Sequence, residues 1–375
     1  MTTKKKNKIA NENAPRVLVI GAGYAGLMAA LRLAPHAHVT LVDPSDRFSE
    51  RIREHELAAG RPDATHSLAG FLHSTGIRHI PARAIAIDLA ARAVTTDDGH
   101  RVPYDRLVYA LGSRTSAAPA DIGGRVHTPE SAEALHKRLL DGPGSLAVVG
   151  GGLTGIELAT ELAEAHPGWS VRLHSAAEIG PGLSAGGRDH VRGVLTARGV
   201  RVHEGHRVAH ADDVDADEVV WTAAMAPNSE LAAAAGLAID PSGRVAVDGV
   251  LRSLSHPEVY VAGDAAAAHS PKAGALRMAC ATAIPTGSHV ATSLIAEFRG
   301  SRPRPLDFGF LLQCVSLGRH DGLVQFVRPD DSPRDRFLKG APAALVKERI
   351  VRSTVGTLRL AAKRPWVVPL VPGMS

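Results

Sequence analysis

Two glycine-rich turns constrain the fold of this chain more than any other feature. Each turn follows a short apolar run and precedes an apolar helix, and a second apolar run follows each helix. Short continuous apolar runs are typical of strands buried in a parallel sheet, and strand, turn, helix and strand form a βαβ unit. The sequence therefore predicts two such units. Their strands are expected at residues 17–20 and 38–42 and at 146–149 and 171–173, with helices that end near Ala34 and Ala165.

The first turn has the residues that a dinucleotide requires. Gly21 permits a tight turn, Gly23 lets backbone approach a pyrophosphate, and Gly26 lets the helix pack close to the strand. The helix N-terminus offers its free N–H groups to the phosphates. Asp43 follows twenty residues after Gly23, at the end of the next strand, where a carboxylate binds an adenosine ribose. A purely structural glycine turn is the alternative, and Asp43 makes it the weaker one. Tyr24 and Ala25 complete the turn.

The second turn repeats the glycines but not the acid. Its candidate binding residues are Gly150, Gly152, Leu153, Thr154 and Gly155. The strand that follows ends in Arg172, His174 and Ser175, and the first carboxylate comes only at Glu178. Arginine, histidine and serine at this position can bind a 2′-phosphate, which a carboxylate would repel. NADH and NADPH therefore both remain open as coenzymes, with Ser175 as a candidate contact.

Composition excludes several classes of protein. A chain of 375 residues predicts two or three domains, and its net charge of +5 favours acidic ligands. Aromatic residues make up only 4%, with no basic stripe among them, so we expect no nucleic-acid partner. The two cysteines, Cys280 and Cys314, lie far apart, which fits a reducing, cytoplasmic location and excludes a disulfide framework. No apolar run reaches about 18 residues. The histidines 203, 206 and 210 are interpreted as scattered surface residues, and no metal site is expected.

Four motifs in order give the chain a specific resemblance. They are the first glycine turn with Asp43, the segment 104–113, the second glycine turn with Glu157, and the segment 259–264. With these the chain resembles the pyridine-nucleotide-dependent flavoproteins that have two dinucleotide-binding domains, most closely the type II NADH dehydrogenase-like and apoptosis-inducing-factor-like members. The resemblance implies an α/β fold with two Rossmann-like three-layer domains and a small C-terminal α+β region. The domains are expected at 15–118 with 240–300 (FAD), 119–239 (NAD(P)H) and 301–375 (C-terminal).

The resemblance also implies roles for individual residues. Asp264 would bind the ribitol of a non-covalently held FAD, and Gly263 would allow its close approach. Glu157, in the first helical turn after Gly155, would position the dihydronicotinamide at the flavin; an ordinary acid at a helix N-terminus is the alternative. The remaining implied FAD contacts are Arg51, Ala84, Ala110, Gly112, Lys272, Cys280 and Ala281.

One departure from the family concerns the electron acceptor. Quinone-reducing members carry two glutamines beside the flavin, where this chain has Ala281 and Pro285. The main hypothesis is hydride transfer from NAD(P)H to flavin N5, then transfer of two electrons to a quinone or another small acceptor. A flavin dehydrogenase or oxidase for a specialised metabolite, and a slow redox-sensing flavoprotein, are the alternatives. Paired catalytic cysteines are not expected, because no two lie close in sequence.

The chain between and after the two units predicts further elements. Strands are expected at 84–89 and 92–96, joined by a hairpin turn at 97–100. A helix is expected at 345–362, with an apolar stripe of Val346, Ile350, Val355, Leu358 and Ala362 among basic residues that include Lys347. Such a helix suits peripheral contact with an anionic membrane. Packing on the protein itself or on a second subunit, as in a homodimer, is the alternative that the narrow stripe favours.

Overall fold

The computed structural model describes residues 13–61, 64–116 and 124–367. Residues 1–12 and the predicted domain boundary at 118–119 lie outside these ranges. Two five-stranded parallel sheets organise the described chain. In spatial order, the first contains β17 (Val259–Val261), β9 (Arg106–Tyr109), β1 (Arg16–Ile20), β2 (His38–Val42) and β5 (Arg78–Ile80). The second contains β11 (Val126–His127), β15 (Glu218–Trp221), β12 (Gly144–Val149), β13 (Trp169–His174) and β14 (Arg201–His203).

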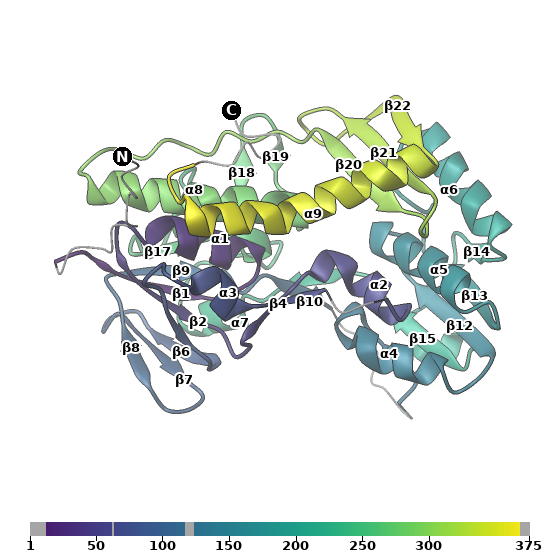
Figure 1. Cartoon of the computed structure of the whole chain (residues 1–375), viewed down its shortest axis with the longest axis horizontal. Helices are drawn as coiled ribbons and strands as arrows, with labels where there is room; N and C mark the ends of the chain where they lie inside the picture. The colour runs from purple at the N-terminus through teal and green to yellow at the C-terminus, as the bar shows by residue number, and fades with distance from the viewer. Residues whose placement is uncertain (1–12, 62–63, 117–123, 368–375) are drawn as a thin grey trace, which may run out of the picture.

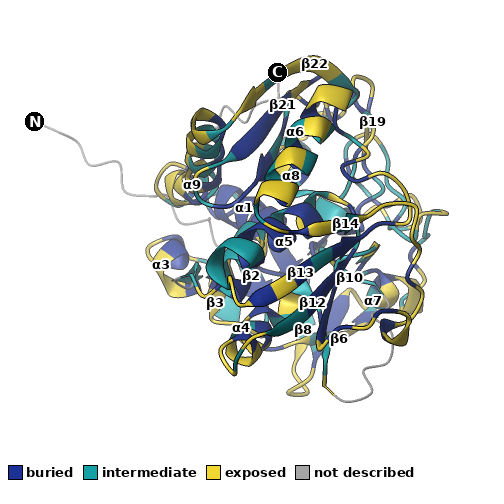
Figure 2. Ribbon diagram, turned by 90° about the vertical axis from the view of Figure 1, so that its right-hand side faces the viewer, coloured by how far each residue is buried: buried dark blue, intermediate teal, exposed yellow. Residues whose placement is uncertain are grey.

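Helices cover both sheets and close their cores. α1 (Tyr24–Leu33) packs along α8 (Cys280–Phe298) on one face of the first sheet, and α5 (Leu153–Ala165) and α6 (Ala185–Ala197) pack on the second sheet (Figure 1). Every residue of α1 is buried, as Figure 2 shows in dark blue. The two Rossmann-like α/β units predicted from the glycine turns are therefore confirmed. The helices are α1 (Tyr24–Leu33), α2 (Glu54–Ala58), α3 (Leu68–Leu72), α4 (Ala132–Leu139), α5 (Leu153–Ala165), α6 (Ala185–Ala197), α7 (Glu230–Ala234), α8 (Cys280–Phe298) and α9 (Ala341–Lys363).

Smaller sheets and ribbons complete the described fold. The strands β6 (Ala84–Asp88), β7 (Ala93–Thr96) and β8 (Arg101–Pro103) form an antiparallel sheet below the first parallel sheet in Figure 1. The turn at 97–100 joins β7 to β8, not the two strands before it, because the β6–β7 connection is made by residues 89–92 instead. The strands are β6 (Ala84–Asp88), β7 (Ala93–Thr96) and β8 (Arg101–Pro103); the two-stranded ribbons are β3 (Arg47–Ser49) with β4 (Thr65–Ser67), β10 (Ser113–Thr115) with β16 (Met225–Pro227), and β18 (His269–Ser270) with β19 (Gly274–Ala275).

The C-terminal region joins the two halves of the molecule. Its antiparallel sheet of β20 (Leu312–Ser316), β21 (Gly322–Val327) and β22 (Pro333–Lys339) packs on α5 and α6. From there α9 runs back to α1 of the first unit, as the yellow helix in Figure 1 shows. No helix in the described ranges is both long enough and apolar enough to cross a membrane.

The buried stripe of α9 differs from the expected one. Val355 and Leu358 are buried as expected, but Val346 and Ile350 are partly exposed. Val351 and Lys347 take the inward positions of the first turns, because the helix docks on α1 and on the C-terminal sheet at once. The helix therefore packs on the protein itself, and it carries one lysine inward.

Candidate functional site

The first glycine turn has little room for anything but glycine at two positions. Gly21 has a φ of +97°, and a Cβ on Gly26 would come within 1.9 Å of the Gly21 carbonyl oxygen. A Cβ on Gly23, by contrast, would meet no atom within 4 Å. Glycine at 21 and 26 thus serves the fold, whereas the space above Gly23, at the N-terminus of α1, is open to a ligand. This open cradle fits a dinucleotide pyrophosphate.

Two carboxylates stand at the ends of this cradle. The Asp43 carboxylate accepts hydrogen bonds from Ala22 N at 2.7 Å and from Ser45 N at 2.9 Å. Asp264, after β17, accepts from Ser113 Oγ at 2.6 Å and from Ala279 N at 3.0 Å. Both carboxylates are thereby held in place with no cationic partner in the part of the chain that the structure describes, which suits acceptors for ribose and ribitol hydroxyl groups. The free N–H groups of the turn and these two acceptor carboxylates together fit FAD at the first unit.

A central cavity of about 330 Å³ brings the two predicted sites together. It lies between the first unit, the start of α5 and the C-terminal region. Most sequence-predicted residues from the FAD side and the start of the second helix line it. These are Gly23, Tyr24, Ala25, Arg51, Ala110, Gly112, Leu153, Thr154, Glu157, Gly263, Asp264 and Cys280.

The remaining predicted residues lie elsewhere. Gly150, Gly152 and Ser175 line a second cavity, of about 530 Å³, beside the second turn. Ala84 begins β6 and packs against the core, and Lys272 forms an ion pair with Asp307 at 2.8 Å. Ala281 is exposed in the first turn of α8. None of these three residues lines the central cavity, so their contact with FAD stays a prediction.

Glu157 has partners that the sequence did not reveal. Its carboxylate accepts a hydrogen bond from Ser316 N on β20 at 2.9 Å and forms an ion pair with Lys347 of α9. The side chains of Glu157 and Lys347 are only 13% and 10% exposed. The signal for Lys347 was its helical spacing with Val351, Val355 and Leu358, which places a lysine within an apolar stripe. A carboxylate of α5 and an ammonium of α9 therefore meet in the cavity wall.

The protonation of this pair follows from its surroundings. Burial raises the pKa of Glu157, but the charge of Lys347 and the hydrogen bonds from Lys347 and Ser316 outweigh it, so that the pKa lies below its ordinary value. Burial lowers the pKa of His55, which also lines the cavity. The Glu157 carboxyl is therefore ionised at neutral pH, with a neutral imidazole nearby.

Both cysteines reach the central cavity. Cys280 begins α8 and Cys314 lies in β20, and both line the cavity wall. The spacing of the two cysteines in the sequence did not predict that they line one cavity, because the docking of the C-terminal sheet brings Cys314 there. Cys280 is exposed toward the cavity, and desolvation by the surrounding protein raises the pKa of its thiol; burial raises that of Cys314 to about 11. Both thiols are therefore protonated at neutral pH and are poor nucleophiles. Among the described residues no group of three or more His, Cys, Asp or Glu side chains is placed to hold a metal ion.

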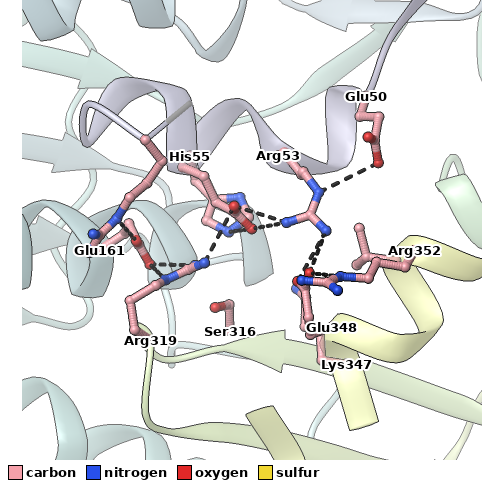
Figure 3. Close-up of polar contacts among 12 residues, drawn as sticks. Glu50, Arg53, His55, Glu161, Ser316, Arg319, Lys347, Glu348 and Arg352 are labelled. Carbon is pink, nitrogen blue, oxygen red and sulfur yellow. Dashed lines mark hydrogen bonds and ion pairs between the residues drawn. The ribbon is translucent and has the colours of Figure 1, made fainter. Parts of the chain in front are cut away.

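A network of ion pairs fixes α9 over this site (Figure 3). Arg53 reaches from the segment before α2 to both oxygens of Glu56 and both oxygens of Glu348 on α9, at 2.9–3.0 Å. Arg319 donates to Glu161, which has no exposed surface, at 2.8 Å. An outer cavity of about 640 Å³ beside this network is lined by Ser316 and shares Lys347 with the central cavity. The network links α2, α5 and α9 around the buried lysine.

Removing Arg53 tests how far this network stabilises the fold. Arg53→Ala leaves Glu56 and Glu348 without their bidentate partner, and we expect a loss of about 2–4 kcal/mol in the free energy of unfolding measured with urea. The matched control is Lys137→Ala, which removes an exposed pair with Glu133 and costs about 0.3–0.5 kcal/mol. Equal effects of the two variants would show that the network is only a surface feature.

The comparisons with known proteins agree with the two dinucleotide-type turns that the structure shows. The family model described as pyridine nucleotide-disulphide oxidoreductase matches residues 15–287. An NADH dehydrogenase-like protein of Mycobacterium tuberculosis is 30% identical, over 89% of this chain and 92% of the relative. The alternative NAD(P)H-ubiquinone oxidoreductase C1 of Arabidopsis thaliana is 25% identical, over 83% of this chain and 72% of the relative.

A solved structure supports the architecture. The sulfide:quinone oxidoreductase of Aquifex aeolicus aligns with a TM-score of 0.78 over 93% of this chain and 92% of that chain, at 19% identity. At this identity the likeness concerns the fold alone.

Proposed function

This chain belongs to the pyridine nucleotide-disulphide oxidoreductase family as an enzyme that uses FAD and NAD(P)H, and from that premise we propose that it passes two electrons to a quinone. FAD, when bound, accepts a hydride at N5 and gives up two electrons. The proposed FAD cradle runs from Gly23 and Asp43 to Asp264. The proposed coenzyme cradle is the second turn, with its helix N-terminus at Gly152.

The observation that carries the quinone proposal is the ion pair of Glu157 and Lys347. A quinone takes up two protons with its two electrons, whereas a one-electron carrier such as an iron–sulfur protein takes up none. An acceptor of the first kind needs a proton donor in the cavity wall. Lys347 lines both the central and the outer cavity, so it can release a proton on one side and regain one from the other. In this role Glu157 holds the Lys347 side chain in place.

The name of one relative favours a quinone as acceptor, whereas the residues at positions 281 and 285 differ from those of quinone-reducing members. The Arabidopsis relative is named for ubiquinone reduction, which supports it. The glutamine pair of quinone-reducing members is replaced by Ala281 and Pro285, which removes two amide groups from the ring's neighbourhood. We propose that Lys347 supplies the polar contact to the quinone oxygen that those amides would otherwise give.

Steady-state assays with matched acceptors test the proposal. The FAD-loaded protein is supplied with NAD(P)H and, in turn, a short-chain ubiquinone, a menaquinone analogue, oxygen and ferricyanide. We expect the quinones to give the highest kcat/KM, and Lys347→Met to lower the quinone rate about 100-fold while the ferricyanide rate stays nearly constant, because ferricyanide takes no proton. Equal loss with both acceptors would contradict the proton-donor role. Slow turnover with every acceptor would favour the redox-sensing alternative.

A further inference from the structure

The second glycine turn has no carboxylate in the place that Asp43 takes beside the first turn. In the first unit β1 pairs with β2 so that Ile20 faces Val42, and in the second β12 pairs with β13 so that Val149 faces His174. The residue after each strand is then Asp43 in one unit and Ser175 in the other. Asp43 receives the N–H of Ala22. Ser175 instead lies over Gly151, where an added Cβ would come within 2.2 Å of the Ser175 Oγ. A neutral hydroxyl thus occupies the place of the ribose-binding acid.

Three histidines gather beside this hydroxyl. The rings of His174 and His203 are stacked with centroids 4.7 Å apart, and the His206 ring lies 5.3 Å from that of His174. These residues are therefore not scattered, because β13 and β14 are neighbours in the sheet and end side by side. His174 is only 7% exposed, and neither of its two buried ring nitrogens has a hydrogen-bond partner among the described residues. A buried imidazole without partners costs stability and points to a ligand that completes its hydrogen bonds.

The second cavity places these groups beside the glycine turn. His174, Ser175, His206 and Arg207 line it together with Gly150–Gly152. His206 and Arg207 are exposed. Burial and the nearby charges of His203, His206 and Arg172 lower the pKa of His174 to about 4, so its neutral ring has one N–H to donate. The cavity therefore offers a guanidinium, a hydroxyl and imidazole groups to a single ligand.

The acidic residues near this cavity are already paired. Glu178 lines it, but its carboxylate lies 3.4 Å from both Arg188 and Arg192. Glu204 accepts hydrogen bonds from Ile179 N at 2.7 Å and from Arg192 at 2.9 Å, and does not line the cavity. Neither the Glu178 nor the Glu204 carboxylate is therefore free to bind a ribose in the way Asp43 can. Arg172 donates to the Asp215 carbonyl oxygen and does not line the cavity.

We propose that Ser175, His174, His206 and Arg207 bind the 2′-phosphate of NADPH, so that this chain uses NADPH in preference to NADH. The inference rests on the proposed function, whose coenzyme it names. A carboxylate at position 175 would bind the 2′-hydroxyl of NADH and repel a phosphate, whereas arginine and imidazole groups bind the phosphate dianion. The guanidinium, imidazole and hydroxyl groups of this cavity fit binding of the 2′-phosphate.

Flavin reduction by each coenzyme gives the kinetic test. With FAD-loaded protein under anaerobic conditions, we expect NADPH to reduce the flavin with at least about tenfold higher second-order rate constant than NADH. Arg207→Ala should lower the NADPH value about 10-fold or more and the NADH value far less, and Ser175→Asp should reverse the preference. His210→Ala is the matched control, since His210 is an exposed histidine of the same segment outside the cavity.

Binding of nucleotide fragments gives a test that does not depend on turnover. By calorimetry, adenosine 2′,5′-bisphosphate should bind the FAD-loaded protein about 10-fold or more tightly than 5′-AMP, and Arg207→Ala should abolish the difference. Equal affinities, an NADH preference, or equal effects of Arg207→Ala on both coenzymes would overturn the inference. If neither coenzyme reduces the flavin, the proposed function fails, and the fragment affinities still decide whether the 2′-phosphate site exists.

Discussion

Gly23→Ala is expected to fold normally and to purify without FAD, whereas Gly152→Ala should keep FAD and lose its affinity for NAD(P)H. Both glycines have φ near −70°, which alanine adopts readily, and a Cβ at either position would meet no protein atom within 4 Å. Neither methyl group therefore disturbs the apoprotein. Each would occupy the space in which a pyrophosphate approaches the backbone.

The size of these effects can be measured separately. For Gly23→Ala we expect a flavin content below about a tenth of wild type, and for Gly152→Ala a KM for NAD(P)H raised about 10-fold or more, since each variant loses contacts worth about 1.5–3 kcal/mol. The contrast is Gly26→Ala, whose Cβ would lie 1.9 Å from the Gly21 carbonyl oxygen and should destabilise the fold itself. Normal flavin content in Gly23→Ala would contradict the assignment of the first turn to FAD.

Lys347→Met is expected to cost about 3–5 kcal/mol of unfolding free energy and to shift the acidic limb of the pH–rate profile to higher pH. The buried carboxylate of Glu157 would lose its lysine partner, and burial would then raise its pKa above the ordinary value. In the wild type the lowered pKa of Glu157 contributes stability that is present above the pKa of the unfolded chain and is lost as pH falls through the lower, folded value.

A double-mutant cycle separates this pair from general damage to the site. The combined variant Glu157→Gln with Lys347→Met should recover about 1–3 kcal/mol of the stability that the two single variants lose together, because it leaves no uncompensated charge. Additive losses would mean that the two side chains do not interact in solution.

The local elements were predictable because their signals are local. The turns at Gly21 and Gly150, the buried strands around them and the helices α1 and α5 all appear within a few residues of their expected positions. Steric rules for glycine and the run of apolar residues act over short distances, so they can be read without the rest of the fold. The α/β architecture with two dinucleotide units follows from these signals.

What could not be predicted depends on contacts between distant segments. Lys347 reaches Glu157 only because α9 crosses from the C-terminal sheet to α1, and this crossing also shifts the buried stripe from Ile350 to Val351. The cavity that Cys280 and Cys314 both line and the stacking of His174 on His203 also join residues that are far apart in the sequence. The roles of the individual site residues stay predictions, with Asp43 and Asp264 held in geometry suited to their expected ligands.

The central claim, that one chain holds FAD in its first unit and receives electrons from NAD(P)H at its second, is tested most directly by anaerobic reduction of the FAD-loaded protein. The visible flavin absorbance is followed while NADPH, and separately NADH, is added in measured steps. The account predicts that one equivalent of coenzyme bleaches one equivalent of flavin in the wild type, and that Gly152→Ala slows this reaction without lowering flavin content. Flavin absorbance that stays unchanged with either coenzyme in the wild type would contradict it.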